Sequence, residues 1–261
     1  MLGQHFLLDL NLTDRIARAA EPLADHLVYE VGPGPGALTR SLLRAGAAHV
    51  IAVERDPRCV EALQDLVAAA AGRLTVIGTD ALDVKVADLV ARHPGLPLKV
   101  VSNLPYNIGT ALLIQWLAVA GSIKSMTLMF QMEVAERLAA VSGGKAYGRL
   151  SVLTQWLCEV ERLFNLPANA FVPPPKVASS VVRLTPRPEP LAAAEMATLE
   201  RVTAAAFGQR RKMVRSSLKT LGVDVAKLLE AAGIEPTARA EDLPVEAFCA
   251  LARNLERHRS P

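Results

Sequence analysis

Four consecutive residues, Asn103, Leu104, Pro105 and Tyr106, combine hydrogen-bond acceptors with an aromatic ring directly after an apolar run. Acceptors beside an aromatic ring suit an amine on a nucleobase, such as N6 of adenine. That amine is a poor nucleophile, because its lone pair is delocalised into the ring. The Asn103 side-chain oxygen and the Leu104 backbone carbonyl could accept hydrogen bonds from both of its N–H groups and stabilise the positive charge that develops during transfer of a methyl group. Pro105 would stiffen the loop, and Tyr106 offers a face for base stacking. The alternative is a plain Asn-x-Pro turn with a half-buried tyrosine.

A glycine-rich loop is the second candidate for chemistry. Gly32, Gly34 and Gly36 alternate with two prolines, after a predicted strand and before a predicted helix. Glycine there lets the backbone approach a ligand at the carboxyl edge of a sheet. Glu54 ends the next predicted strand, where a carboxylate can accept hydrogen bonds from both ribose hydroxyls. Together these features favour an adenosine-containing ligand, although a purely structural turn remains possible.

The residues around this loop discriminate between adenosine ligands. Pro33 and Pro35 have no N–H to donate to a pyrophosphate, and Glu30 would repel phosphates. S-adenosylmethionine carries no phosphate, and its sulfonium and ammonium groups suit the Glu30 carboxylate. Asp80, followed by Ala81, lies at the end of the third predicted strand and could accept a hydrogen bond from the adenine amine of the cofactor. The alternative for Asp80 is an N-cap of the following segment. The alternative for Glu30 is a carboxylate that caps the loop after it.

One further aromatic residue is ambiguous. Phe171 precedes Val172 and three prolines. It could close the second face of the target base, opposite Tyr106, or it could be a core phenylalanine that leads into an extended segment.

The predicted helices and strands that position the candidate site residues indicate an α/β fold. Short apolar runs alternate with amphipathic segments, which indicates a mostly parallel sheet with helices on both faces. The predicted strands are 27–31, 49–53, 74–77, 98–102 and 126–130, and the predicted helices are 37–45, 57–71, 85–91 and 110–119. Each candidate loop therefore follows the carboxyl end of a strand.

The pattern changes after residue 130. Helices are predicted at 133–140 and 150–157, and two late strands at 160–166 and 179–184 could add an antiparallel edge to the sheet. Alternating prolines at 186–190 form a linker candidate. Beyond it only helices are predicted, at 195–207, 213–221, 225–232 and 245–255. We therefore expect a first domain over residues 1–187 and a small helical domain over 188–261.

Composition sets outer limits. The 261 residues are 51% hydrophobic and carry a net charge of +3, which argues against disorder and is only weak evidence for a nucleic-acid partner. Cys59, Cys158 and Cys249 are scattered, so neither a metal site nor a redox motif is expected, and a reducing cytosol fits. We expect no signal peptide and no membrane span, and hence a cytoplasmic protein, as a monomer.

Basic residues gather near the start of the predicted helix at 213–221. They could neutralise phosphates without reading sequence, or form a solvated helix face. The candidates for RNA binding are Arg210, Arg211, Lys212 and Arg215, with Lys145, Arg149 and Lys176 beside the proposed cleft.

Several motifs as a set resemble the ribosomal RNA adenine N6,N6-dimethyltransferase family, and most closely its bacterial small-subunit branch. These motifs are Gly3-Gln4-His5-Phe6-Leu7, Glu30-Val31-Gly32-Pro33-Gly34, Val53-Glu54-Arg55-Asp56, Asn103-Leu104-Pro105-Tyr106-Asn107-Ile108, Lys145-Ala146-Tyr147-Gly148-Arg149-Leu150-Ser151, Phe171-Val172-Pro173-Pro174-Pro175-Lys176-Val177 and Phe207-Gly208-Gln209-Arg210-Arg211-Lys212.

The resemblance implies a Rossmann-like class I methyltransferase domain with a small all-α C-terminal domain. It implies cofactor contacts from His5 and Leu7, and from Gly32, Glu54, Asp80 and Asn103. It also implies a substrate: two adjacent adenosines in the 3′-terminal hairpin loop of 16S rRNA, each dimethylated on an assembling small subunit.

Two departures from the family pattern stand out. Members usually carry a basic extension before the first motif, whereas this sequence begins almost inside it, and His5 stands where many members have asparagine. The alternatives are a large-subunit rRNA methyltransferase of the macrolide-resistance type, a non-catalytic ribosome-assembly factor, and a nicotinamide dehydrogenase. The segments 145–151 and 210–212 favour the small-subunit enzyme, and the intact loop at 103–106 favours retained catalysis.

Overall fold

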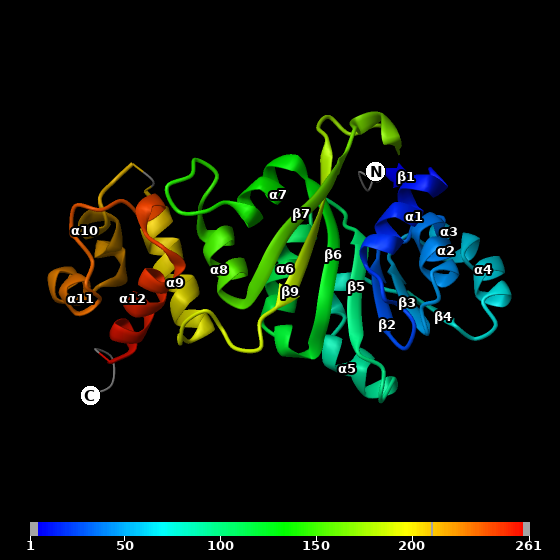
Figure 1. Cartoon of the computed structure of the whole chain (residues 1–261), viewed down its shortest axis with the longest axis horizontal. Helices are drawn as coiled ribbons and strands as arrows, with labels where there is room; N and C mark the ends of the chain where they lie inside the picture. Colours follow the sequence, from blue (N-terminus) through cyan, green and yellow to red (C-terminus); the bar gives the residue numbers. More distant parts are fainter. Residues whose placement is uncertain (1–4, 210, 258–261) are drawn as a thin grey trace. The chain divides into compact units, whose positions relative to one another are not determined.

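The computed structural model describes residues 5–209 and 211–257, so Arg210 lies outside the described residues. Contacts divide the chain into two compact units (Figure 1). The first comprises Met1–Ala135 and Glu161–Pro186, and the second comprises Glu136–Val160 and Arg187–Pro261. The second unit thus includes a segment before residue 188 that the single predicted boundary leaves in the first domain.

A seven-stranded sheet organises the first unit, with strand order β4-β3-β2-β5-β6-β9-β7. Neighbours from β4 to β6 run parallel, and β9 pairs antiparallel with β6. The strands are β2 (Leu27–Val31), β3 (His49–Glu54), β4 (Leu74–Gly78), β5 (Leu98–Asn103), β6 (Ile123–Gln131), β7 (Cys158–Leu166) and β9 (Ser179–Pro186). All predicted strands are confirmed, and so is the mixed sheet with a late antiparallel pair.

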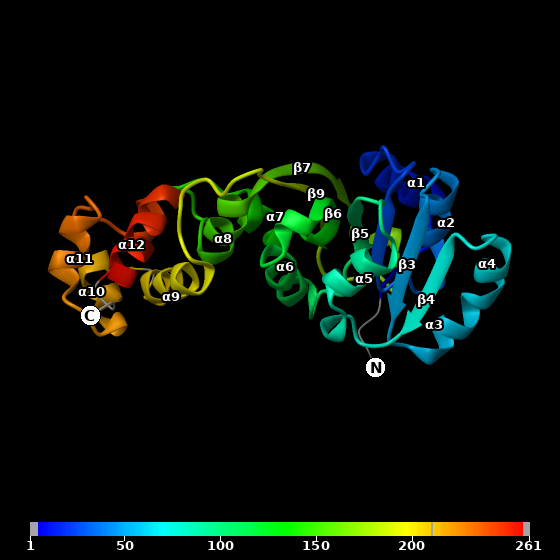
Figure 2. The same ribbon diagram turned by 90° about the horizontal axis from the view of Figure 1, so that it is seen from below.

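Strand β2 shows why the central sequence is apolar at every position. Successive side chains point to opposite faces, and all five residues of β2 are buried. Val28 packs in a core with Leu42 of α2 (Ala37–Arg44), whereas the Tyr29 ring meets Trp116 of α6 (Gly109–Leu117) edge-on, with centroids 5.9 Å apart. Burial on both faces is the signature of a parallel sheet covered by helices, as the strands and flanking helices in Figure 2 illustrate.

Two features of the helices differ from the prediction. The predicted helix at 57–71 is divided at the buried Leu63 into α3 (Pro57–Ala62) and α4 (Gln64–Ala69). A helix that was not predicted, α1 (Leu10–Ala19), begins after Asp9, whose carboxylate accepts a hydrogen bond from the Asn11 N–H. The remaining helix in this unit is α5 (Val86–Arg92), and a 3₁₀ turn, η1, spans Ala81–Asp83.

A small second sheet ties the start of the chain to its middle. Strand β1 (Phe6–Leu7) pairs antiparallel with β8 (Phe171–Val172), so that Leu7 lies opposite Phe171. Both of these side chains are buried in the core that contains Val28. The pairing holds residues 5–7 beside the carboxyl ends of the central strands.

Helices make up most of the second unit, with α9 (Met196–Phe207) and α12 (Val245–Arg257) at its centre. Phe207 and Phe248 stack with ring centroids 5.4 Å apart, which joins these two helices. The other helices are α8 (Arg149–Leu157), α10 (Val214–Ser217) and α11 (Val225–Ala231), while α7 (Met132–Ala139) and β7 cross the unit boundaries. The predicted helix at 213–221 is α10 continued by a 3₁₀ turn, Leu218–Leu221.

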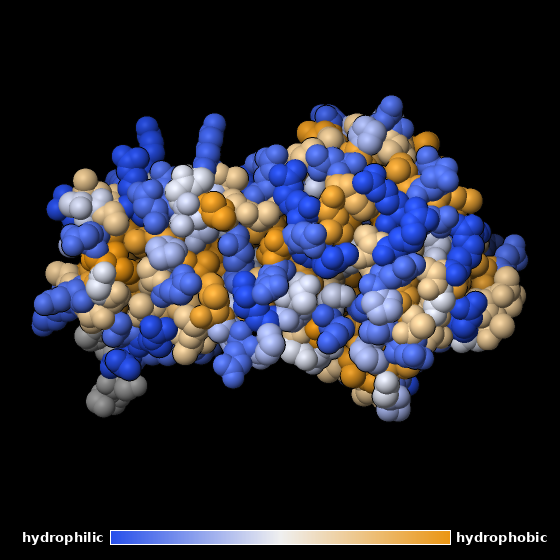
Figure 3. Space-filling view, in the orientation of Figure 1, coloured by the Kyte–Doolittle hydropathy of each residue, from blue (hydrophilic) through white to orange (hydrophobic). Residues whose placement is uncertain are grey.

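The visible surface alternates hydrophilic and hydrophobic residues, with hydrophobic ones in small patches (Figure 3). Among the described residues, no helix combines the length and apolar character that crossing a membrane demands. The three cysteines carry free thiols.

Candidate active site

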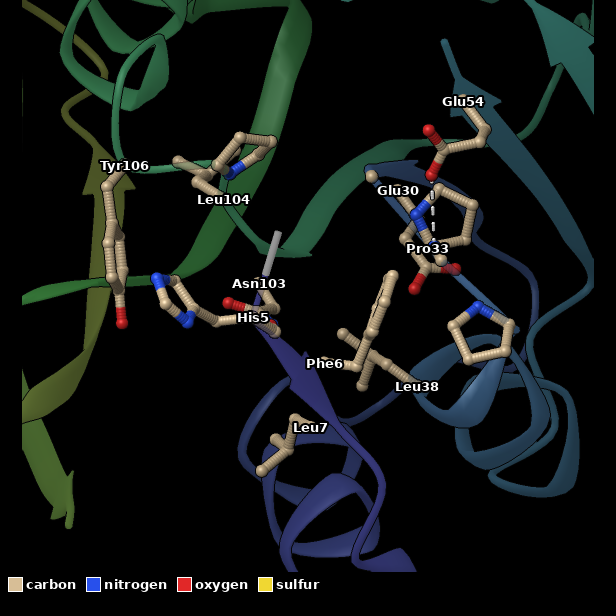
Figure 4. Close-up of a pocket in the computed structure, with 14 residues that line it drawn as sticks. His5, Phe6, Leu7, Glu30, Pro33, Leu38, Glu54, Asn103, Leu104 and Tyr106 are labelled. Carbon is tan, nitrogen blue, oxygen red and sulfur yellow. Dashed lines mark hydrogen bonds between the residues drawn. The ribbon is translucent and has the colours of Figure 1, made fainter. Parts of the chain in front are cut away.

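A cavity opens at the carboxyl ends of β2, β3 and β5, with about 730 Å³ of empty space of which part is open to solvent. It brings together residues from the first motif, the glycine loop and the loop after β5 (Figure 4). Its lining residues are His5, Phe6, Leu7, Glu30, Gly32, Pro33, Gly34, Pro35, Leu38, Glu54, Asn103, Leu104, Pro105 and Tyr106. Four of the five predicted catalytic residues and seven of the nine predicted cofactor contacts therefore share one cavity.

The glycine loop adopts a backbone that needs glycine. Gly34 has φ +54°, and a Cβ there would lie 2.7 Å from the Phe6 ring. Gly32 has φ +67°, and its Cβ would lie 3.3 Å from the Pro105 ring. Residues with side chains are disfavoured at positive φ. The glycine loop therefore lies against Phe6 on one side and against Pro105 of the 103–106 loop on the other, which brings the three segments together.

Glu54 is 5% exposed, and its carboxylate is hydrogen-bonded to the glycine loop. One carboxylate oxygen, Oε2, accepts a hydrogen bond from the Gly34 N–H at 3.1 Å, and Oε1 accepts one from the Asp56 N–H at 2.8 Å. A carboxylate has about four acceptor sites, so two hydroxyl groups of a ligand could still donate to it.

Glu30 is a buried carboxyl group, only 1% exposed. Its Oε2 accepts a hydrogen bond from the Thr39 hydroxyl at 2.7 Å on α2, rather than from the loop that follows Glu30. Burial raises the pKa of Glu30 to about 8, the Thr39 bond opposes this, and the charge of Glu54 adds to it. The carboxyl group lacks a cationic partner among the described residues, and a cationic ligand group in the cavity would supply one.

Asp80 lines an adjoining cavity of about 520 Å³, which shares Gly32, Glu54 and Pro105 with the first. Its Oδ1 accepts from the Leu82 N–H at 3.0 Å, so the N-cap interpretation is confirmed. Its Oδ2 accepts from Arg55 at 3.0 Å. Ala81 also lines this second cavity. The cleft thus extends from the glycine loop to the end of β4.

Asn103 is the last residue of β5. Its Nδ2 makes a long hydrogen bond of 3.5 Å to the His5 carbonyl, which leaves Oδ1 to accept. No hydrogen bond to Asn103 Oδ1 or to the Leu104 carbonyl occurs within residues 5–209 and 211–257. The nearby Ser102 hydroxyl donates to the Val31 carbonyl at 2.6 Å and joins the ends of β5 and β2. Asn103 and Leu104, which both line the cavity, therefore each keep an oxygen that can accept a hydrogen bond from a ligand.

Tyr106 follows these acceptors and is half-buried. Its hydroxyl lies 2.6 Å from the hydroxyl of Ser179 at the start of β9. Burial raises the pKa of Tyr106, and the bond to Ser179 partly opposes this. Ser179 is not among the predicted site residues, because an isolated serine carries no sequence pattern.

The His5 imidazole points toward Tyr106 rather than toward the glycine loop (Figure 4), with ring centroids 5.8 Å apart. Its Nδ1 lies 2.7 Å from the Pro173 carbonyl. A carbonyl can only accept, so Nδ1 carries the proton. The first motif also contributes Phe6, which no prediction named although its ring lines the cavity beside Gly34.

Phe171 is the one predicted catalytic residue that does not line the cavity. It is 2% exposed and belongs to the core cluster with Leu7 and Val28. This position matches the alternative of a core phenylalanine at the start of the proline-rich segment.

The predicted RNA-binding residues lie in both units. Lys176 belongs to the first unit, and the others that the structure describes belong to the second. All are exposed: Lys145, Arg149, Lys176, Arg211, Lys212 and Arg215. Arg149 makes a long ion pair of 4.0 Å with Glu200. Among the described residues, no three His, Cys, Asp or Glu side chains gather as a metal site would require.

Solved structures with a similar fold define the class of this protein. It aligns with a dimethyladenosine transferase from Plasmodium falciparum over 97% of this chain and 98% of that one, at a TM-score of 0.83 and 24% identity. It aligns with the 23S rRNA methyltransferase ErmE over 96% and 99%, at a TM-score of 0.70 and 29% identity. These two likenesses, together with the open sheet and its glycine loop, show that the chain has a Rossmann-like methyltransferase fold.

The family follows from the sequence comparisons. The model of the family "Ribosomal RNA adenine dimethylase" matches residues 1–257. A protein of Rhodospirillum rubrum named "Ribosomal RNA small subunit methyltransferase A" is 60% identical over 98% of this chain and 87% of its own length. A protein of the same name from Paramagnetospirillum magneticum is 59% identical over 98% and 89%. This chain belongs to the ribosomal RNA adenine dimethylase family, and it is an rRNA adenine dimethyltransferase.

Proposed function

We propose that this chain transfers methyl groups from S-adenosylmethionine to N6 of two adjacent adenosines in the 3′-terminal hairpin loop of small-subunit rRNA. The product is N6,N6-dimethyladenosine, formed during assembly of the subunit in the cytoplasm. One observation carries the proposal: Asn103 and Leu104, the residues that bear the two acceptor oxygens, line the same cavity as the glycine loop and Glu54. The names of the relatives that are 59–60% identical support the choice of subunit.

The residues present fit S-adenosylmethionine. The spare acceptor sites of Glu54 suit its ribose hydroxyls, and the buried Glu30 carboxyl group suits a positively charged ligand group. Asp80 and Ala81, in the adjoining cavity, would contact the adenine of the cofactor. The backbone of residues 5–7 and of Gly32 and Gly34 would border the remainder, while the Leu7 side chain stays in the core.

The cofactor supplies an electrophilic methyl group, and the protein prepares the nucleophile. Asn103 Oδ1 and the Leu104 carbonyl would accept hydrogen bonds from the two N6 N–H groups of an adenine that stacks on Tyr106. These bonds would draw the nitrogen lone pair out of conjugation with the ring and direct it toward the methyl group of the bound cofactor, which would leave as S-adenosylhomocysteine. Positive charge that develops on nitrogen is stabilised by both acceptors. The methylated ammonium is acidic, so it loses its proton to water without a strong base.

RNA affinity is assigned to exposed basic residues. Arg211, Lys212 and Arg215 of the second unit would contact phosphates, together with Lys145 and Arg149. Lys176 would do the same from the first unit. Arg210, outside the described residues, stays part of this proposal. The division into a methyltransferase part and a helical RNA-binding part is likewise proposed, and a monomer suffices because one chain carries every group named above.

The decisive experiment offers S-adenosylmethionine with a labelled methyl group to unmethylated small subunits, large subunits and free RNA. Digestion to nucleosides then identifies the product and the substrate together. We expect label in N6,N6-dimethyladenosine from small subunits, and labelling that is about 10²–10³-fold slower with the Asn103→Ala variant. Label confined to large subunits would favour the alternative activity suggested by the likeness to ErmE, and subunit binding without any label would favour a non-catalytic assembly factor.

A further inference from the structure

One hydroxyl from a distant element contacts the aromatic ring of the candidate site. Ser179 lies 73 positions after Tyr106 in the sequence, yet their hydroxyl oxygens are 2.6 Å apart. Ser179 is 0% exposed, and it begins β9, opposite Gln131 of β6 in the sheet register. Because both strands belong to the seven-stranded sheet, the serine provides a rigid anchor.

Tyr106, by contrast, lies in a loop after β5 and before α6. A tyrosine in a loop can occupy several χ1 rotamers, so a further contact is needed to hold its ring in one direction. Its other recorded ring neighbour is His5, at a centroid distance of 5.8 Å and a tilt of 32°. A tilted ring contact alone holds the ring weakly, whereas a hydrogen bond at its tip fixes the direction in which the ring extends from the backbone.

We propose that Ser179 is a positioning residue for methyl transfer, whose hydroxyl holds the tip of the Tyr106 ring and so keeps the ring in the position against which the target adenine stacks. This inference rests on the proposed function. A ring held in one position places N6 of the base at the two acceptor oxygens in a single orientation. Ser179 itself touches neither the base nor the cofactor in this account.

The adjacent residue is a matched control. Ser180 is also 0% exposed and lies on the same strand. Its hydroxyl donates to the Phe164 carbonyl at 3.4 Å, within the sheet region and outside the cavity. Replacing either serine with alanine removes one buried hydroxyl from β9, but only Ser179→Ala removes the contact with Tyr106.

The experiment compares the full-length wild type with Ser179→Ala, Ser180→Ala, Tyr106→Phe and the double variant Ser179→Ala/Tyr106→Phe in methylation of unmethylated small subunits. We expect Ser179→Ala to lower kcat by about fivefold to tenfold, as loss of one hydrogen bond in a buried site predicts. KM for the subunit and the affinity for S-adenosylhomocysteine should change by less than about twofold, since phosphate contacts dominate RNA affinity. Ser180→Ala should match the wild type.

The double variant separates positioning from stability. Both single substitutions remove the same hydrogen bond, so the double variant should be no slower than the slower single variant. Tyr106→Phe also removes the bond from its half-exposed partner, and it therefore tests the inference even if Ser179→Ala does not fold. A hairpin RNA with 2-aminopurine at the target position adds a spectroscopic readout, because stacking quenches its fluorescence; the quenching should weaken in Ser179→Ala and persist in Ser180→Ala.

Any of three results would overturn the inference. The first is a kcat for both Ser179→Ala and Tyr106→Phe equal to that of the wild type, and the second is losses that add in the double variant. Equal losses in Ser179→Ala and Ser180→Ala would also overturn it, since they would indicate general destabilisation. Failure of the wild type to methylate small subunits would instead contradict the proposed function.

Discussion

The cavity of the first unit and the basic segment of the second unit hold their ionisable side chains in opposite ways. Glu30 and Glu54 are 1% and 5% exposed; Glu30 accepts a hydrogen bond from Thr39, and Glu54 accepts two from backbone N–H groups. Arg211, Lys212 and Arg215 are all exposed. A buried carboxylate acts at a defined point on a ligand, whereas an exposed cation attracts phosphates over many geometries. Groups that set reaction geometry should therefore respond sharply to substitution, and groups that provide affinity should respond gradually.

The largest effect is expected from Asn103→Ala, which removes one of the two acceptors for the N6 protons. Loss of one preorganised hydrogen-bonding group should lower kcat by about 10²–10³-fold, measured by single-turnover methylation. Affinity for the small subunit should change little, because Asn103 lies in the cavity and contributes no charge. Asn165→Ala, an exposed substitution near the end of β7, is the control. Full activity in Asn103→Ala would remove the proposed catalytic role.

Gly34→Ala should come next, because it places a methyl group 2.7 Å from the Phe6 ring at φ +54°. We expect affinity for S-adenosylhomocysteine to fall by at least about tenfold in calorimetry as the loop is displaced. Gly46→Ala is a matched control, since Gly46 has φ +88° but nothing within 4 Å of an added Cβ. Both variants should lose about 1 kcal/mol of stability, and equal cofactor affinity in the two would contradict the close approach at Gly34.

Substitution of Arg211, Lys212 and Arg215 by alanine should weaken subunit binding by about tenfold at moderate salt and lower the dependence of log K on log salt by about 0.7–0.9 per lost phosphate contact. The value of kcat at saturating subunit should stay unchanged, in contrast to Asn103→Ala. Binding isotherms at several salt concentrations measure this. Lys85→Ala, an exposed change in the first unit, is the control; an unchanged salt dependence in the triple variant would exclude these residues from the interface.

The last effect is on stability rather than on activity, and it concerns the buried Glu30, whose pKa is raised by burial to about 8 from its usual 4.5. Between these values the folded protein keeps a proton that the unfolded chain has released. Stability of the ligand-free protein should therefore fall as pH rises through this window, with a slope of at most about 1.4 kcal/mol per pH unit from this group. Urea unfolding of wild type and Glu30→Gln across pH should give curves that diverge in that window, and parallel curves would contradict the assignment.

The central strands and the candidate ligand-binding residues at their ends could be predicted from the sequence, because the signals for both are local. Fully buried parallel strands read as apolar runs, and the residue types at Gly34, Glu54 and Asn103 reflect chemistry at strand ends. The pairing of Phe6 with Val172 could not be foreseen, since it joins segments more than 160 positions apart and each strand has two residues.

The same limit explains the side chains that were missed or left open. The contact between Tyr106 and Ser179 depends on the antiparallel register of β9 on β6, which no local pattern specifies. Phe171 carried two interpretations, because an aromatic residue before prolines suits both a base contact and a core. The orientation of His5 toward Tyr106 depends on the Pro173 carbonyl, again a distant partner.

The most direct test of the central claim is a crystal structure with S-adenosylhomocysteine and a hairpin RNA that carries the target adenosines. The account predicts an unstacked adenine on the Tyr106 ring, with its N6 at about 3 Å from both Asn103 Oδ1 and the Leu104 carbonyl oxygen. An adenine bound in the cavity with N6 directed away from these two oxygens would contradict it.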